Sequence, residues 1–110
     1  MNKNILVIAA HPDDEILGCG GTVARLVKEE GYSAYSLVPG EGIAGRKGEG
    51  SLLKKQQELR AHMKKAGKIL GMQSVDIPQS ELFPDQKLDQ VPLLEIIHCI
   101  EKHLNSIKPD

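Results

Sequence analysis

The chain is poor in the residue types that nucleic-acid-binding proteins use. Of its 110 residues, 3% are aromatic and none is tryptophan, so stacking platforms for single-stranded nucleic acid are not expected. Fourteen Lys and Arg residues stand against fifteen Asp and Glu residues, which gives a formal net charge of -1. Without a basic excess, counterion release cannot drive binding to a phosphate backbone. We therefore expect no nucleic-acid partner.

The sequence also lacks long apolar segments and closely spaced cysteines. No apolar run approaches the roughly 20 residues that a membrane helix needs, and the N-terminus has no signal-peptide pattern. Cys19 and Cys99 lie far apart and form no C-x-x-C pair, so reduced thiols are expected. These features predict a cytoplasmic protein, built as one domain, that does not associate with membranes.

Strand-like and helix-like segments alternate along the chain. Residues 4–10 form an unbroken apolar run, which is typical of a strand that is covered on both faces of a parallel sheet. The alternation predicts a Rossmann-like α/β fold with three αβα layers and a mostly parallel sheet. Strands are expected at 4–10, 33–38 and 75–77, and helices at 18–31, 52–70 and 93–107.

The sequence ends at a point where an α/β fold of this kind would be expected to continue. The last predicted helix runs into Lys108-Pro109-Asp110, where a doubly wound fold continues into another strand. Three short strands also make a thin core. We therefore expect the sequence to be truncated after the third helix, so that residues 1–110 form the N-terminal part of a larger domain.

The segment with the clearest chemical content is His11-Pro12-Asp13-Asp14-Glu15, directly after the first predicted strand. Ligands of open α/β sheets bind at the carboxyl ends of the strands. Three successive acids repel one another unless a cation or hydrogen bonds hold them, and imidazole and carboxylate together suit Zn²⁺. Acids at the start of a helix are also stabilised by its dipole, so metal binding and helix capping both remain open from spacing alone.

The glycines of Gly18-Cys19-Gly20-Gly21 invite comparison with a dinucleotide-binding turn. They lie several residues past the strand, and the intervening acids would repel a pyrophosphate. A metal site therefore explains this turn better than a phosphate site.

The segment Ala10–Glu15, followed by Gly18–Thr22, resembles the signature of the LmbE-like (PIG-L) family of zinc-dependent N-deacetylases. That family removes acetyl groups from N-acetylglucosamine-type sugars and related amides on a Rossmann-like fold. The resemblance covers essentially the whole chain, in order. Its further segments are Pro39–Gly42, Glu58–Ala61, Ile69–Gly71, Pro84–Asp89 and Lys108–Asp110.

The resemblance implies a role for each residue of the turn. His11 and Asp14 would be ligands of Zn²⁺, and Asp13 would be the general base that takes a proton from the zinc-bound water. For Glu15, a supporting role or a position at the start of the helix agrees with the resemblance at least as well as a direct role in the reaction.

Three further residues are candidates for contacts to an N-acetylated sugar substrate. Arg60 stands where the family's second-helix arginine reaches the substrate, and Asp85 lies in a Pro-Asp-Gln segment where the family usually has Asn in place of Gln86. Glu41, with Arg46, lies in a glycine-rich segment that could cover the substrate. A solvated arginine, a turn-forming aspartate and a simple surface loop remain the alternatives.

The resemblance also implies an incomplete site. The family's third zinc ligand is a histidine beyond Lys-Pro-Asp, so we expect this chain alone to bind zinc weakly and to be a poor deacetylase. Two non-catalytic alternatives remain. The chain could bind a sugar or nucleotide sugar without catalysis, or it could self-associate as a homo-oligomer through an open sheet edge.

Overall fold

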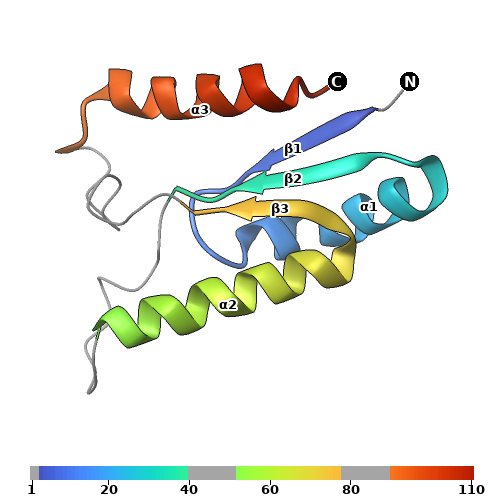
Figure 1. Cartoon of the computed structure of the whole chain (residues 1–110), viewed down its shortest axis with the longest axis horizontal. Helices are drawn as coiled ribbons and strands as arrows, with labels where there is room; N and C mark the ends of the chain where they lie inside the picture. Colours follow the sequence, from blue (N-terminus) through green and yellow to red (C-terminus); the bar gives the residue numbers. More distant parts are fainter. Residues whose placement is uncertain (1–2, 40–51, 78–89) are drawn as a thin grey trace.

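The computed structural model describes residues 3–39, 52–77 and 90–110 (Figure 1). Strands and helices alternate along these segments, as predicted. In chain order, they are β1 (Asn4–Ile8), α1 (Asp14–Glu30), β2 (Ser33–Leu37), α2 (Leu52–Leu70), β3 (Met72–Asp76) and α3 (Leu93–Ile107).

The three strands form one parallel sheet in the order β1-β2-β3. Asn4 pairs with Ser33 at the start of β1, and the register continues to Ile8 beside Leu37. The carboxyl ends of all three strands therefore meet at one edge of the sheet. This arrangement confirms the predicted α/β fold and places the segment after β1 where ligands bind in such sheets.

The helices cover both faces of the sheet (Figure 1). Helices α1 and α2 lie on one face and α3 lies on the other, which gives the predicted αβα layering. The buried core lies on the α1 and α2 side, in two clusters. One contains Val23, Ala34 and Met72, and the other contains Val38, Met63 and Ile77. None of the described helices is long and apolar enough to cross a bilayer.

Helix α1 differs most from its sequence prediction, because it begins at Asp14 and not at Gly18. The carbonyl of Asp13 accepts hydrogen bonds from the N–H groups of Ile16 (3.0 Å) and Leu17 (2.8 Å), so the acidic residues already form the first turn. The glycine-rich part of the helix is irregular, since Cys19 has a non-helical φ of -145°. Gly31 ends the helix with a φ of 71°, as its place in the sequence predicted.

Helix α3 is held against strand β1 by polar contacts near the carboxyl end of the helix. The side-chain amide of Asn4 donates to the carbonyl of Ile107 at 2.7 Å, and the backbone N–H of Asn4 donates to Asp110 Oδ2 at 2.7 Å. The N–H of Asp110 in turn donates to the carbonyl of Asn4 at 2.9 Å. Because α3 has no fully buried residue, these bonds contribute a large part of what fixes it to β1.

Candidate functional site

The turn between β1 and α1 has an unusual backbone at Asp13. This residue precedes the helix with φ 83° and ψ -29°, in the left-handed region. Few non-glycine residues adopt this conformation, although Asp is enriched among them. A left-handed backbone at a residue other than glycine costs free energy and persists only where its surroundings impose it. The turn therefore has a fixed shape, which fixes the positions of the neighbouring residues.

His11 and Asp14 lie on the same side of this turn. His11 Nδ1 is 3.8 Å from Asp14 Oδ2, and the two side chains are 45% and 55% exposed. This separation is longer than a hydrogen bond, and both groups are accessible from solvent. The structure thus brings together the imidazole and the carboxylate that were predicted as zinc ligands, with Asp13, also exposed, between them in sequence.

Glu15 points away from this exposed pair and into the protein. Its side chain is 2% exposed, and its Oε2 has no hydrogen-bond partner among the described residues. Burial raises the pKa of the Glu15 carboxyl, and the negative charges of Asp13 and Asp14 raise it further, against hydrogen bonds from the backbone of Glu15 and Asp13. The motif therefore divides into three solvent-facing groups and one internal carboxyl under the turn.

The donor set of the turn fits zinc only in part. An imidazole nitrogen and a carboxylate oxygen are both zinc ligands in proteins, and catalytic zinc sites use three protein ligands. Within residues 3–39, 52–77 and 90–110, no group of three His, Cys, Asp or Glu side chains is placed to hold a metal ion. The described part of the chain therefore brings together two side chains of suitable donor types, His11 and Asp14, and no third.

Arg60 lies near the carboxyl edge of the sheet, where it supports the end of β3. Its Nη1 donates a hydrogen bond of 3.0 Å to the carbonyl of Ile77, which follows β3 directly. The half-buried guanidinium thus contacts the backbone at the edge where ligands are expected. Glu41 and Asp85, together with Arg46, lie outside the described residues.

Sequence reasoning did not identify a polar contact that joins β3 to α3. His103 Nε2 contacts Asp76 Oδ2, and His103 Nδ1 lies 2.8 Å from the carbonyl oxygen of Cys99. Burial raises the pKa of the Cys99 thiol, and the negative charge of Asp76 adds to this effect. The only sign in the sequence was a carboxylate, Asp76, inside the apolar segment predicted as a strand at 75–77. Nothing in the spacing pairs it with a distant histidine.

Comparisons with known proteins identify relatives of this chain. The family model described as PIG-L, GlcNAc-PI de-N-acetylase, matches residues 6–110. Among curated proteins, the chain is 39% identical over 69 residues to the uncharacterized deacetylase YaiS of Escherichia coli (strain K12). That match covers 63% of this chain and 33% of YaiS.

Two solved structures are similar to the chain. GalB, the 4-carboxy-2-hydroxymuconate hydratase of Pseudomonas putida KT2440, superposes with a TM-score of 0.74 at 26% identity, over 97% of this chain and 44% of GalB. The conserved protein TT1542 of Thermus thermophilus superposes with a TM-score of 0.50 at 37% identity, over 82% of this chain and 40% of that protein. The chain thus spans less than half the length of each of these relatives.

Proposed function

Since the chain belongs to the GlcNAc-PI de-N-acetylase (PIG-L) family, we propose that it carries the water-activating residues of a zinc-dependent N-deacetylase. The substrate class would be N-acetylglucosamine-type sugars or their conjugates, and the products would be acetate and a free amine. A relative named as a deacetylase supports this reaction type. The observation that carries the proposal is the placement of His11 and Asp14 on one exposed turn at the carboxyl edge of the sheet.

In this proposal, His11 and Asp14 would hold the metal, and a further ligand would come from outside the described residues. When bound, zinc acts as a Lewis acid that polarises a carbonyl and makes water more acidic. Asp13 accepts the proton of the attacking water, because it is exposed and lies between the two proposed ligands in the sequence of the turn. The left-handed backbone of Asp13 restricts the positions that its carboxylate can take.

The other residues have supporting roles in the same proposal. Glu15, which is buried, would support the turn from the protein interior and take no direct part in the reaction. Arg60 stabilises the end of β3 through Ile77, and its guanidinium would also bind substrate hydroxyls. Glu41 and Asp85 remain proposed substrate contacts.

Zinc titration by calorimetry tests the metal part of the proposal. We expect the chain to bind zinc weakly, because the described residues supply two of the three protein ligands that a catalytic site uses. His11→Ala or Asp14→Ala should weaken that binding at least about tenfold, whereas His98→Ala, which removes an exposed imidazole on α3, should leave it unchanged. Equal zinc affinity in all four proteins would contradict the assignment of these ligands.

A deacetylation assay tests the catalytic part. Acetate release from N-acetylglucosamine derivatives should be slow for this chain and should fall further in Asp13→Asn, since the amide cannot accept the proton of water. Zinc binding in this variant should be retained, which separates loss of the base from loss of the metal. Unchanged acetate release in Asp13→Asn would show that another group activates the water.

A hydratase is the second candidate, and it rests on one finding. The structure with a TM-score of 0.74 is a hydratase of an unsaturated carboxylic acid. Activation of water by a carboxylate serves both reactions, but hydration adds the water across a carbon–carbon double bond and releases no acetate. Incubation with a conjugated unsaturated dicarboxylic acid, followed by its ultraviolet absorbance, would detect this activity in the absence of acetate release.

A further inference from the structure

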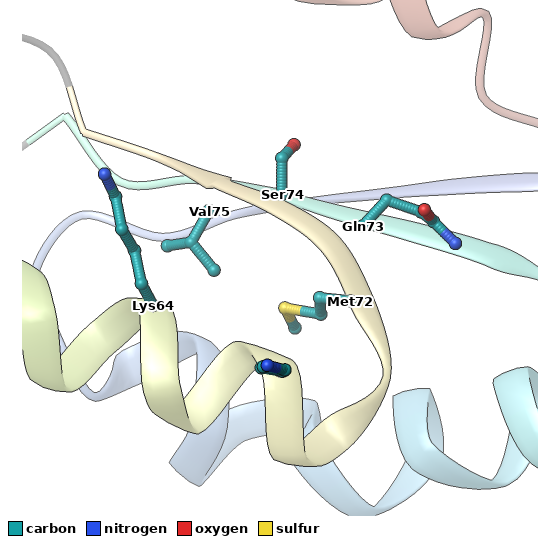
Figure 2. Close-up of a pocket in the computed structure, with 6 residues that line it drawn as sticks. Lys64, Met72, Gln73, Ser74 and Val75 are labelled. Carbon is teal, nitrogen blue, oxygen red and sulfur yellow. The ribbon is translucent and has the colours of Figure 1, made fainter.

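A groove runs along the outer edge of the sheet, apart from the turn at its carboxyl edge. It lies between helix α2 and strand β3, and Figure 2 shows the side chains around it. Its volume is about 550 Å³. The residues that line it are Lys64 and Lys68 from α2, and Met72, Gln73, Ser74 and Val75 from β3.

One wall of the groove is a strand edge that carries no partner strand within the described part of the chain. There, strand β3 pairs with β2 alone. The carbonyl of Asp76 accepts a hydrogen bond from Val38 at 2.9 Å, toward β2. Because successive residues of a strand direct their backbone groups to opposite sides, Val75 directs its N–H and C=O outward, toward the groove.

The floor of the groove is apolar and closely packed. Met72 is buried, and Val75 packs against both core clusters. Figure 2 shows both side chains pointing from β3 toward α2, while Ser74 points to the opposite face. Helix α2 approaches the strand closely at Gly67, where an added Cβ would lie 2.4 Å from Val75 Cγ2.

The helical wall of the groove is basic. Helix α2 contains six Lys and Arg residues and a single acid, Glu58, although the whole chain has a net charge of -1. Lys64 and Lys68 are exposed one helical turn apart, and no carboxylate is among the described residues that line the groove. An occupant of this groove would therefore be negatively charged.

We propose that this groove binds an extended acidic segment of another polypeptide, which adds to the sheet beside β3. Backbone hydrogen bonds to the free edge would align the segment, as in other complexes that extend a sheet. Its apolar side chains would face Met72 and Val75, and its carboxylates would pair with Lys64 and Lys68. The need for a strand edge and an apolar floor favours a peptide over a nucleic acid.

Titration with a designed peptide, followed by NMR, tests the proposal. The probe is a capped hexapeptide with glutamate, valine and glutamate at its first, third and fifth positions, which share one face of a strand, and threonine at the other positions. We expect it to shift the amide signals of residues 73–75 and to bind at least ten times more weakly to Lys64→Glu/Lys68→Glu. The matched control, Lys28→Glu/Lys102→Glu, reverses two exposed charges on α1 and α3 and should bind like the wild type.

A second probe separates strand addition from adsorption to a basic surface. The same hexapeptide, methylated on alternate backbone nitrogens, keeps its charge and cannot form a full hydrogen-bonded ladder. Loss of at least tenfold in affinity supports the proposal. Equal binding of the methylated peptide, tighter binding of oligothymidylate, or no binding to the wild type would overturn it, and the last result would assign the lysines to protection of the edge against aggregation.

Discussion

Replacement of Gly67 by alanine tests how closely α2 packs on the sheet. An ideal Cβ at this position lies 2.4 Å from Val75 Cγ2 and 3.6 Å from the sulfur of Met72. Carbon atoms in contact are normally about 3.5–4.0 Å apart, so the valine or the helix must move by roughly 1 Å. Valine is stiff at χ1 and Val75 packs against both core clusters, so we expect the helix to move.

Two effects of opposite sign determine the change in the free energy of unfolding. Overpacking of a core costs about 1–3 kcal/mol, whereas Gly to Ala in a helix gains about 1 kcal/mol. Gly67→Ala should therefore lower the free energy of unfolding by about 1 kcal/mol. Gly21→Ala in α1 is the matched control because nothing lies within 4 Å of its added Cβ. Its free energy of unfolding should rise by about 1 kcal/mol, from helix propensity alone.

Urea unfolding followed by circular dichroism measures both variants. The free energy of unfolding of Gly21→Ala should exceed that of Gly67→Ala by about 1–3 kcal/mol, which isolates the overpacking cost. Val75→Ala should cost less stability in the Gly67→Ala background than in the wild type, since it removes the atom that the new methyl group meets. If Gly67→Ala matched Gly21→Ala in stability, α2 could move away from β3 without cost and the argument from close packing would be refuted.

Three further outcomes follow from charged and polar groups. Burial raises the pKa of Glu15 above its ordinary 4.5, so the folded state loses stability as pH rises through the folded pKa. Glu15→Gln should therefore be more stable than the wild type at pH 7, with a smaller difference at pH 4 in urea melts; a larger difference at pH 4 would contradict this sign. His103→Gln should lower the free energy of unfolding by about 1 kcal/mol or less, because Asp76 is 54% exposed, and His98→Gln on the same helix should have no effect. Because burial raises the pKa of Cys99, iodoacetamide should alkylate this thiol more slowly at pH 8 than in the urea-unfolded chain; equal rates would contradict the burial.

The fold could be predicted wherever two local signals agreed. Helix α2 has the predicted bounds because its apolar periodicity and Gly71, with φ 86°, end at the same place. The start of α1 was wrong because the glycines that suggested a boundary lie inside a helix that is irregular at Cys19. Strand β3 begins at Met72, earlier than predicted, because pairing with Ala34 extends it and the sequence pattern does not reveal that partner.

The candidate site could be predicted to the extent that it is local. His11, Asp13 and Asp14 lie on a single turn, so their proximity follows from the chain itself. The contact between His103 and Asp76 depends on how α3 crosses the opposite face of the sheet, which no short motif encodes. The burial of Glu15 could not be predicted either. Helix capping and metal binding both explain acidic residues at the start of a helix, and neither indicates which of the three acids is buried.

The parallel pairing of the strands has a consequence for the order of folding. No strand of this sheet can pair with its neighbour through a tight hairpin, since Asn4 meets Ser33 and Ala34 meets Met72 only after a helix-length segment has been closed. Such separations slow the search for native contacts, whereas the turns of a helix form from neighbouring residues. We therefore expect helical signal to develop early in refolding and the β-ladder to assemble late, so that the strand edges stay exposed longest in the newly made chain.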